Sequence, residues 1–199
     1  MARGRTHLSR SKTLLVMGVT AVVILAVSYL TNRPATHGGL TLAGLSTGAA
    51  GPAPVVGMAA PNFTATMMEG AKVTLRGLRG HPVWLSFGAP WCQPCRAENP
   101  DIEAAYEKYR AQGLEVLWIV INDSRSDVES YAKRTGLTYP MVDDSSGAIE
   151  ARYRIDGIPS HFFIDKSGIL REVRISSLNP AMIEENLAQI GVHVAGSSR

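Results

Sequence analysis

The sequence predicts an α/β domain, with a central sheet flanked by helices, behind an apolar N-terminal segment. Three observations predict it. From residue 72 onward, strand-like apolar runs alternate with helix-like segments. The only two cysteines stand three positions apart where a strand-like run gives way to a helix-like one. An uncharged stretch, residues 14–30, follows a basic head at residues 1–13.

The N-terminal segment is expected to be a membrane anchor. As a helix, residues 14–30 would span about 26 Å, near the lower limit for crossing a bilayer. The basic head, residues 1–13, contains Lys and Arg but no acid, which favours a cytoplasmic location for that end. We therefore expect a single-pass protein of the cell membrane whose domain is extracytoplasmic. A cleaved signal peptide ending near Ala26-Val27-Ser28 is the alternative.

The charge balance argues against nucleic-acid binding. After residue 13, 16 basic residues face 17 acidic ones, so the basic excess belongs to the head alone. Residues 31–54 are rich in Gly, Ala, Thr and Pro, which is typical of a flexible linker. We expect the folded domain at residues 55–192 and a short tail at 193–199.

The first half of the domain has a short strand, a buried strand, a helix and a second buried strand. They are expected at residues 72–75, 82–87, 95–112 and 114–121. Helical spacing places Ile102, Ala105 and Tyr109 on one face of the helix, which Gly113 ends. The run Leu114 to Ile121 is almost entirely apolar, as in a central strand covered on both sides.

The second half continues the pattern and closes with a hairpin and a helix. Helices are expected at residues 127–134, 148–153 and 180–190, and strands at 161–164 and 169–175. Gly136 stops the first of these helices, and Pro180 suits the start of the last. Asp165 to Gly168 is a hairpin-type turn between the two strands.

The cysteine pair favours redox chemistry over a structural role. A disulfide across two residues closes too short a loop to stabilise the fold strongly, and a structural zinc site needs about four ligands. Cys92 would lie at a helix N-terminus, where backbone N–H groups and the helix dipole stabilise a thiolate. Cys95, one turn later, would resolve a mixed disulfide, and Pro94 would stiffen the turn.

Further motifs extend this pattern along the chain. They are the opening Ala60-Pro61-Asn62-Phe63, the cysteine segment Phe87 to Pro100, and Tyr153 to Pro159 followed by Phe162 to Asp165 and Gly168. With these motifs, residues 55–192 resemble the TlpA/ResA-like thiol-disulfide oxidoreductases of bacteria, which are membrane-anchored members of the thioredoxin superfamily. The resemblance implies a thioredoxin fold, in which helices flank a central mixed sheet, and a redox-active Cys92–Cys95 disulfide.

The resemblance also implies a proton-handling role for Glu98, one helical turn after Cys95. Thioredoxins keep a buried aspartate on the strand before the motif, and Ser86 takes that position here. In the family, the glutamate matching Glu98 serves Cys95 instead, as a partly buried acid that accepts or donates a proton. The alternative is an ordinary solvated helix glutamate.

Four residues are expected to bind the substrate. The resemblance implies that Pro159 is cis, lies beside the disulfide and, with Ile158, presents backbone to a substrate peptide. Trp91 and Pro94 would shape the motif itself.

The chain departs from the family pattern close to this groove. Gly88 replaces a tryptophan, which should thin the wall beside the motif. Ser160-His161 replaces a threonine pair.

The implied function is reduction of disulfides outside the membrane, for instance in apocytochrome c during cytochrome c-type biogenesis. Electrons would come from a membrane thiol carrier of the CcdA type. No bound cofactor or metal is needed, because the disulfide carries two electrons. One alternative is an oxidant that forms disulfides. Another is a Sco-like copper chaperone using Cys92, Cys95 and His161, although such proteins have three residues between their cysteines.

Overall fold

The computed structural model describes residues 21, 22 and 53–193. The chain divides into two units, Met1–Thr47 and Gly48–Arg199. Only Ala21 and Val22 are described in the first, and both are helical. The basic head, nearly all of the expected anchor and most of the linker therefore lie outside the described residues. Within the described part, no helix is both long and apolar enough to cross a membrane.

The second unit contains seven strands and four α-helices among its described residues. The strands are β1 (Thr64–Thr66), β2 (Lys72–Thr74), β3 (Val83–Gly88), β4 (Glu115–Val120), β5 (Met141–Asp143), β6 (Ser160–Ile164) and β7 (Leu170–Arg174). The helices are α2 (Gln93–Tyr109), α3 (Arg125–Thr135), α4 (Ala148–Tyr153) and α5 (Pro180–Gln189), with short 3₁₀ turns at Leu75–Leu78 and Arg110–Gln112.

The central sheet is mixed, with strand order β5-β4-β3-β6-β7. Strands β3, β4 and β5 run parallel, whereas β6 and β7 add in the antiparallel sense. Ser86 of β3 lies between Trp118 of β4 and His161 of β6. Paired residues on adjacent strands point to the same face, so these three side chains share one side of the sheet.

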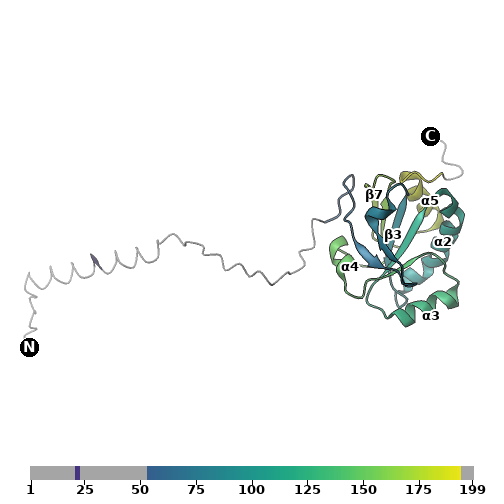
Figure 1. Cartoon of the computed structure of the whole chain (residues 1–199), viewed down its shortest axis with the longest axis horizontal. Coiled ribbons are helices and arrows are strands. Elements are labelled where there is room, and N and C mark those ends of the chain that lie inside the picture. Colours follow the sequence, from purple (N-terminus) through teal and green to yellow (C-terminus); the bar gives the residue numbers. More distant parts are fainter. Residues whose placement is uncertain (1–20, 23–52, 194–199) are drawn as a thin grey trace, which may run out of the picture. The chain divides into compact units, whose positions relative to one another are not determined.

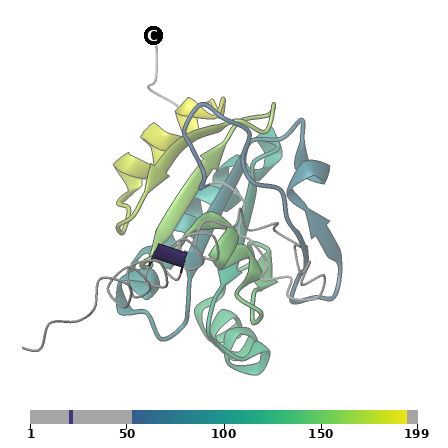
Figure 2. The same ribbon diagram turned by 90° about the vertical axis from the view of Figure 1, so that its left-hand side faces the viewer.

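Helices cover both faces of this sheet (Figure 1). The face that carries Trp84 and Trp118 packs against α2, α3 and α5. The opposite face, with Leu85 and Phe87, packs against α4 and the residues around β2. The separate β1–β2 hairpin lies beside the sheet (Figure 2). The result is the helix-flanked mixed sheet that the sequence predicts.

The main differences from the sequence prediction are two short strands and the bounds of helix α2. Strands β1 and β5 were not expected, because each is short and is defined by its pairing with a neighbouring strand, β2 and β4 respectively. Helix α2 begins at Gln93, with Cys92 as its N-cap, rather than at Cys95. Pro94 fits this earlier start, since the first helical turn does not need its missing N–H. The end of the predicted helix is a 3₁₀ turn closed by Gly113 in the left-handed conformation.

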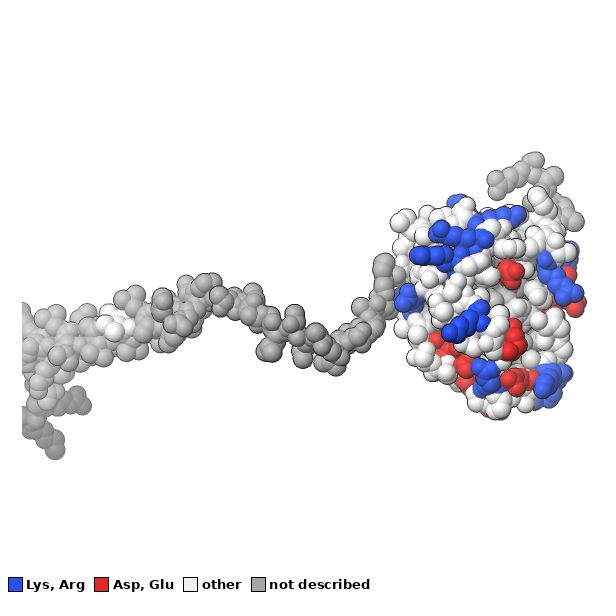
Figure 3. Space-filling model, viewed as in Figure 1, with Lys and Arg blue, Asp and Glu red and all other residues white. Residues whose placement is uncertain are grey.

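The charged surface of the domain is mixed in sign. On the face shown in Figure 3, acidic side chains are interspersed among Lys and Arg. Opposite charges pair across this surface, for instance Lys108 with Glu184 at 2.6 Å and Arg171 with Asp165 at 2.5 Å. This distribution agrees with the near-zero charge of the chain after its basic head.

Candidate active site

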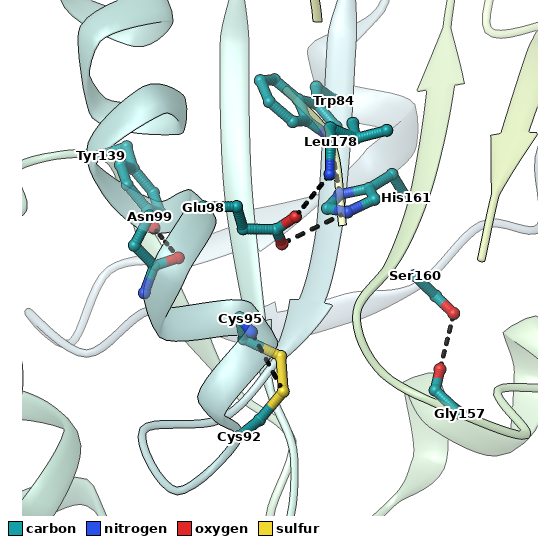
Figure 4. Close-up of polar contacts among 10 residues, drawn as sticks. All are labelled: Trp84, Cys92, Cys95, Glu98, Asn99, Tyr139, Gly157, Ser160, His161 and Leu178. Carbon is teal, nitrogen blue, oxygen red and sulfur yellow. Dashed lines mark hydrogen bonds and ion pairs between the residues drawn. A yellow bond between two sulfur atoms is a disulfide. The ribbon is translucent and has the colours of Figure 1, made fainter. Parts of the chain in front are cut away.

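Cys92 and Cys95 form a disulfide directly after β3, at the start of α2 (Figure 4). Their Cα atoms are 5.3 Å apart. The sulfur of Cys92 accepts the backbone N–H of Cys95 at 3.2 Å, so the cysteine itself caps the helix. In the reduced protein, that N–H and the helix dipole would stabilise a thiolate on Cys92. Cys92 is 5% exposed and Cys95 1%, which makes Cys92 the more accessible sulfur.

The loop before β6 lies against this disulfide. Its Ile158–Pro159 peptide bond is cis, the geometry that the resemblance implies. The Ile158 side chain packs against the buried cluster formed by Ala89, Cys92 and Cys95, and Pro159 is buried. The Ser160 hydroxyl donates to the Gly157 carbonyl at 2.7 Å, which closes the loop on itself (Figure 4). Residues far apart in the sequence therefore meet at the redox pair.

Trp91 is the exposed aromatic residue next to the disulfide, with 59% of its surface accessible. Its indole N–H donates to the backbone carbonyl of Asn122 at 3.2 Å, in the loop after β4. Asn122 itself has a φ of 51°, in the left-handed region that asparagine tolerates better than most residues. The indole is thus held at one end while its face remains open to solvent.

Glu98 is buried rather than solvated, with 3% of its surface exposed. One carboxylate oxygen accepts the backbone N–H of Leu178 at 3.0 Å. The other lies 3.3 Å from Nε2 of His161. In Figure 4, the Glu98 side chain and the disulfide project from the same side of α2. This burial excludes the alternative of a solvated helix glutamate.

His161 is fully buried, and both of its ring nitrogens face protein groups. The indole N–H of Trp84 donates to Nδ1 at 3.3 Å, and Nε2 faces Glu98. Among the residues that the structure describes, no group of three or more His, Cys, Asp or Glu side chains is arranged to hold a metal ion. In this oxidised form the two cysteines of the copper alternative are bonded to each other, and His161 faces Glu98 and Trp84 instead.

Asn99, the residue after Glu98, belongs to a separate buried network. Its amide nitrogen donates to the hydroxyl of Tyr131 at 3.1 Å, and its amide oxygen accepts from that of Tyr139 at 2.9 Å. Burial raises the pKa of Tyr139 well above its usual value, so this network is uncharged.

Gly88 lies in a tight space rather than beside a thinned wall. A β-carbon at this position would stand 2.7 Å from the indole nitrogen of Trp118 and 3.3 Å from the sulfur of Cys95. Trp118 is fully buried, as its apolar strand context predicts. The expectation that the glycine opens the wall is therefore wrong at this point, because Trp118 and Cys95 fill the space next to it.

Comparison with known proteins agrees with this geometry. The AhpC/TSA family matches residues 56–173. The chain is 34% identical over 135 residues to the thiol-disulfide oxidoreductase ResA of Geobacillus kaustophilus, covering 68% of this chain and 78% of that protein. The chain belongs to the AhpC/TSA family and is a thiol-disulfide oxidoreductase of the ResA type.

Two further relatives support the assignment. ResA of Bacillus subtilis is 29% identical over 129 residues, covering 65% of this chain and 72% of that protein. The crystal structure of a thiol:disulfide interchange protein of the thioredoxin family from Chlorobium tepidum superposes with a TM-score of 0.62 at 28% identity. The match covers 69% of this chain and 99% of that one. The fold of this oxidoreductase is thus thioredoxin-like.

Three contacts of this oxidoreductase site were not found from the sequence. The partners of Trp91 and Glu98 are the backbone groups of Asn122 and Leu178, which leave no side-chain signal. The contact between His161 and Glu98 was not predicted either, because it depends on strand register and helix packing and not on a local sequence pattern. The available signal was His161 itself, a polar residue in an otherwise apolar strand, which suggests a buried polar partner.

Proposed function

We propose that this oxidoreductase reduces disulfides of protein substrates outside the cytoplasm. The observation that carries the proposal is the arrangement around one helix terminus. There the more accessible sulfur of Cys92 caps α2, cis Pro159 lies alongside, and Glu98 is buried one turn behind Cys95. Each of these features serves a step of thiol-disulfide exchange.

The exchange proceeds in two steps. The Cys92 thiolate attacks a substrate disulfide, forms a mixed disulfide and releases one substrate thiolate. Glu98 then takes the proton of the Cys95 thiol, and the Cys95 sulfur attacks Cys92 and releases the second substrate thiolate. Two electrons have passed to the substrate, and the Cys92–Cys95 disulfide is restored. A dithiol donor must reduce it again before the next turnover.

The substrate binds across the surface around the disulfide. Trp91 offers an exposed aromatic face, and Ile158 offers a partly exposed apolar side chain against the sulfurs. The backbone at Ile158 and Pro159 pairs with an extended substrate segment, as a strand edge would. Pro94 keeps the motif in the shape that this pairing needs.

The setting follows from the N-terminal sequence and the ResA resemblance together. Residues 14–30 anchor the chain as a single span, with the domain outside. A membrane thiol carrier of the CcdA type supplies the electrons. Apocytochrome c, whose cysteines must be reduced before haem attachment, is the proposed substrate.

Variants of the two cysteines test the site. Cys92→Ser should abolish exchange with a disulfide-containing peptide, whereas Cys95→Ser should accumulate a mixed disulfide between Cys92 and the peptide, detectable by mass spectrometry. Full activity in both variants would refute the assignment.

The reduction potential tests the direction of exchange. A value near that of thioredoxin, about −270 mV, supports a reductant. A value near about −120 mV makes the protein an oxidant that forms disulfides.

A further inference from the structure

One buried ring atom behind the disulfide lacks an aligned partner. Among the described residues, Nε2 of His161 is the only fully buried side-chain nitrogen or oxygen without a hydrogen bond of good geometry. It nevertheless lies 3.3 Å from a carboxylate oxygen of Glu98, which is within hydrogen-bonding distance. The two atoms are therefore close but not aligned as a hydrogen bond.

The contact on the other side of the ring fixes where its proton sits. An indole N–H can only donate, so Nδ1 of His161 must accept from Trp84 with its lone pair. A neutral imidazole then carries its single proton on Nε2. A doubly protonated ring would place an N–H against the indole N–H. Trp84 therefore selects the form of His161 that offers an N–H to Glu98.

Few other titratable or charged groups lie near the Glu98–His161 pair. Cys95 lies one turn away on α2, and Tyr139 is near enough to sense the charge of Glu98. Arg174 on β7 stands opposite His161 in the sheet. Its guanidinium contacts Asn186 of α5 at 3.4 Å and Glu172 at 3.6 Å.

A buried carboxylate needs donors to stay charged. The structure gives Glu98 two candidates: the backbone N–H of Leu178 and the ring of His161.

We propose that His161, oriented by Trp84, is a positioning residue that holds the Glu98 carboxylate ready to accept the proton of Cys95. The inference rests on the role of Glu98 in the proposed function and assigns its partner. His161 touches neither substrate nor sulfur in this scheme. Its effect should therefore fall on the second step of exchange, the attack by Cys95, and leave the first attack by Cys92 unchanged.

The test compares two substitutions of His161. A glutamine can accept from Trp84 with its oxygen and donate to Glu98 with its amide, whereas a leucine of similar bulk can do neither. We expect His161→Leu to slow release of the mixed disulfide at least tenfold at neutral pH and to move the rate's pH profile to higher pH. His161→Gln should stay within about threefold of the unaltered protein. Equal losses in both variants would overturn the proposal.

A double variant separates this inference from the proposed function. In a Glu98→Gln background, His161→Leu should cause no further loss, because its effect passes through Glu98. A further tenfold loss there would overturn the positioning role while leaving that of Glu98 intact. If Glu98→Gln alone has no effect, the proton role of Glu98 fails, and this inference fails with it.

A spectroscopic measurement needs no substitution. In ¹⁵N NMR spectra of the reduced protein, the neutral His161 ring should carry its proton on Nε2 and a lone pair on Nδ1. A proton on Nδ1 would contradict the proposal even if the leucine variant did not fold.

Discussion

Glu98 and Asn99 are consecutive buried residues of α2, yet they enter two different polar regions. Both hydrogen bonds of the Asn99 amide go to tyrosine hydroxyls, so that region is neutral and its contacts are aligned. Glu98 brings a carboxylate into the core and has one aligned donor and one misaligned neighbour, His161. A satisfied neutral network stabilises a fold, whereas a buried acid with incomplete contacts suits proton transfer.

Substituting Glu98 should change mainly the exchange rate, whereas substituting Asn99 should change mainly the free energy of unfolding. The Glu98 substitution should have the largest effect of all those predicted. Glu98→Gln keeps the side-chain shape but cannot take a proton, so we expect the exchange rate to fall about 100-fold. Asn99→Ala should leave the rate per folded molecule within about twofold. It should lower the free energy of unfolding by about 2–3 kcal/mol, because it leaves two buried hydroxyls without partners. Stopped-flow kinetics and urea unfolding of the oxidised proteins measure the two quantities. If the two variants lost rate and stability to the same extent, the proposed difference between the two polar regions would be wrong.

Gly88 lies where the two regions meet, next to both Cys95 and Trp118. The Trp118 ring packs against Tyr131 and Tyr139 of the neutral network. In Gly88→Ala, the added methyl group would press on a buried indole that has little room to move. We expect the free energy of unfolding to fall by about 1–3 kcal/mol. Thermal or urea unfolding measures this change. An unchanged midpoint would show that Trp118 and Cys95 can shift to accommodate the methyl group without loss of stability.

The network of Asn99, Tyr131 and Tyr139 should make the free energy of unfolding depend on pH in the alkaline range. This effect should be smaller than those of the Glu98 and Gly88 substitutions. Because burial raises the pKa of Tyr139, the unfolded chain loses this proton before the folded protein does. Stability from this group is present below about pH 10 and decreases above it, by up to about 1.4 kcal/mol per pH unit.

Urea midpoints between pH 9 and 11 measure this decrease. Tyr139→Phe should be less stable at pH 8 but lose less on going to pH 11. Parallel curves for the two proteins would contradict the expectation.

The sequence predicted four of the five strands of the central sheet, the four described helices and the redox pair, because each has a local signal. Periodicity identified α2, and the spacing of Cys92 and Cys95 identified the chemistry. The three-residue strand β5 was missed because its place depends on pairing with β4. The surroundings of Glu98 could not be predicted either, since they are set by strand register and by the backbone of Leu178.

The disulfide closes a loop of only four residues, so the cross-link itself adds about 2 kcal/mol to folding in the chain-entropy view. The domain should therefore keep its shape through every catalytic cycle. Any remaining difference in folding free energy between the oxidised and reduced forms then appears as a change in electrical potential, at about 30 mV for each 1.4 kcal/mol. Calorimetry on the oxidised and reduced forms should therefore give a difference in folding free energy that matches the reduction potential measured by electrochemistry on the native protein.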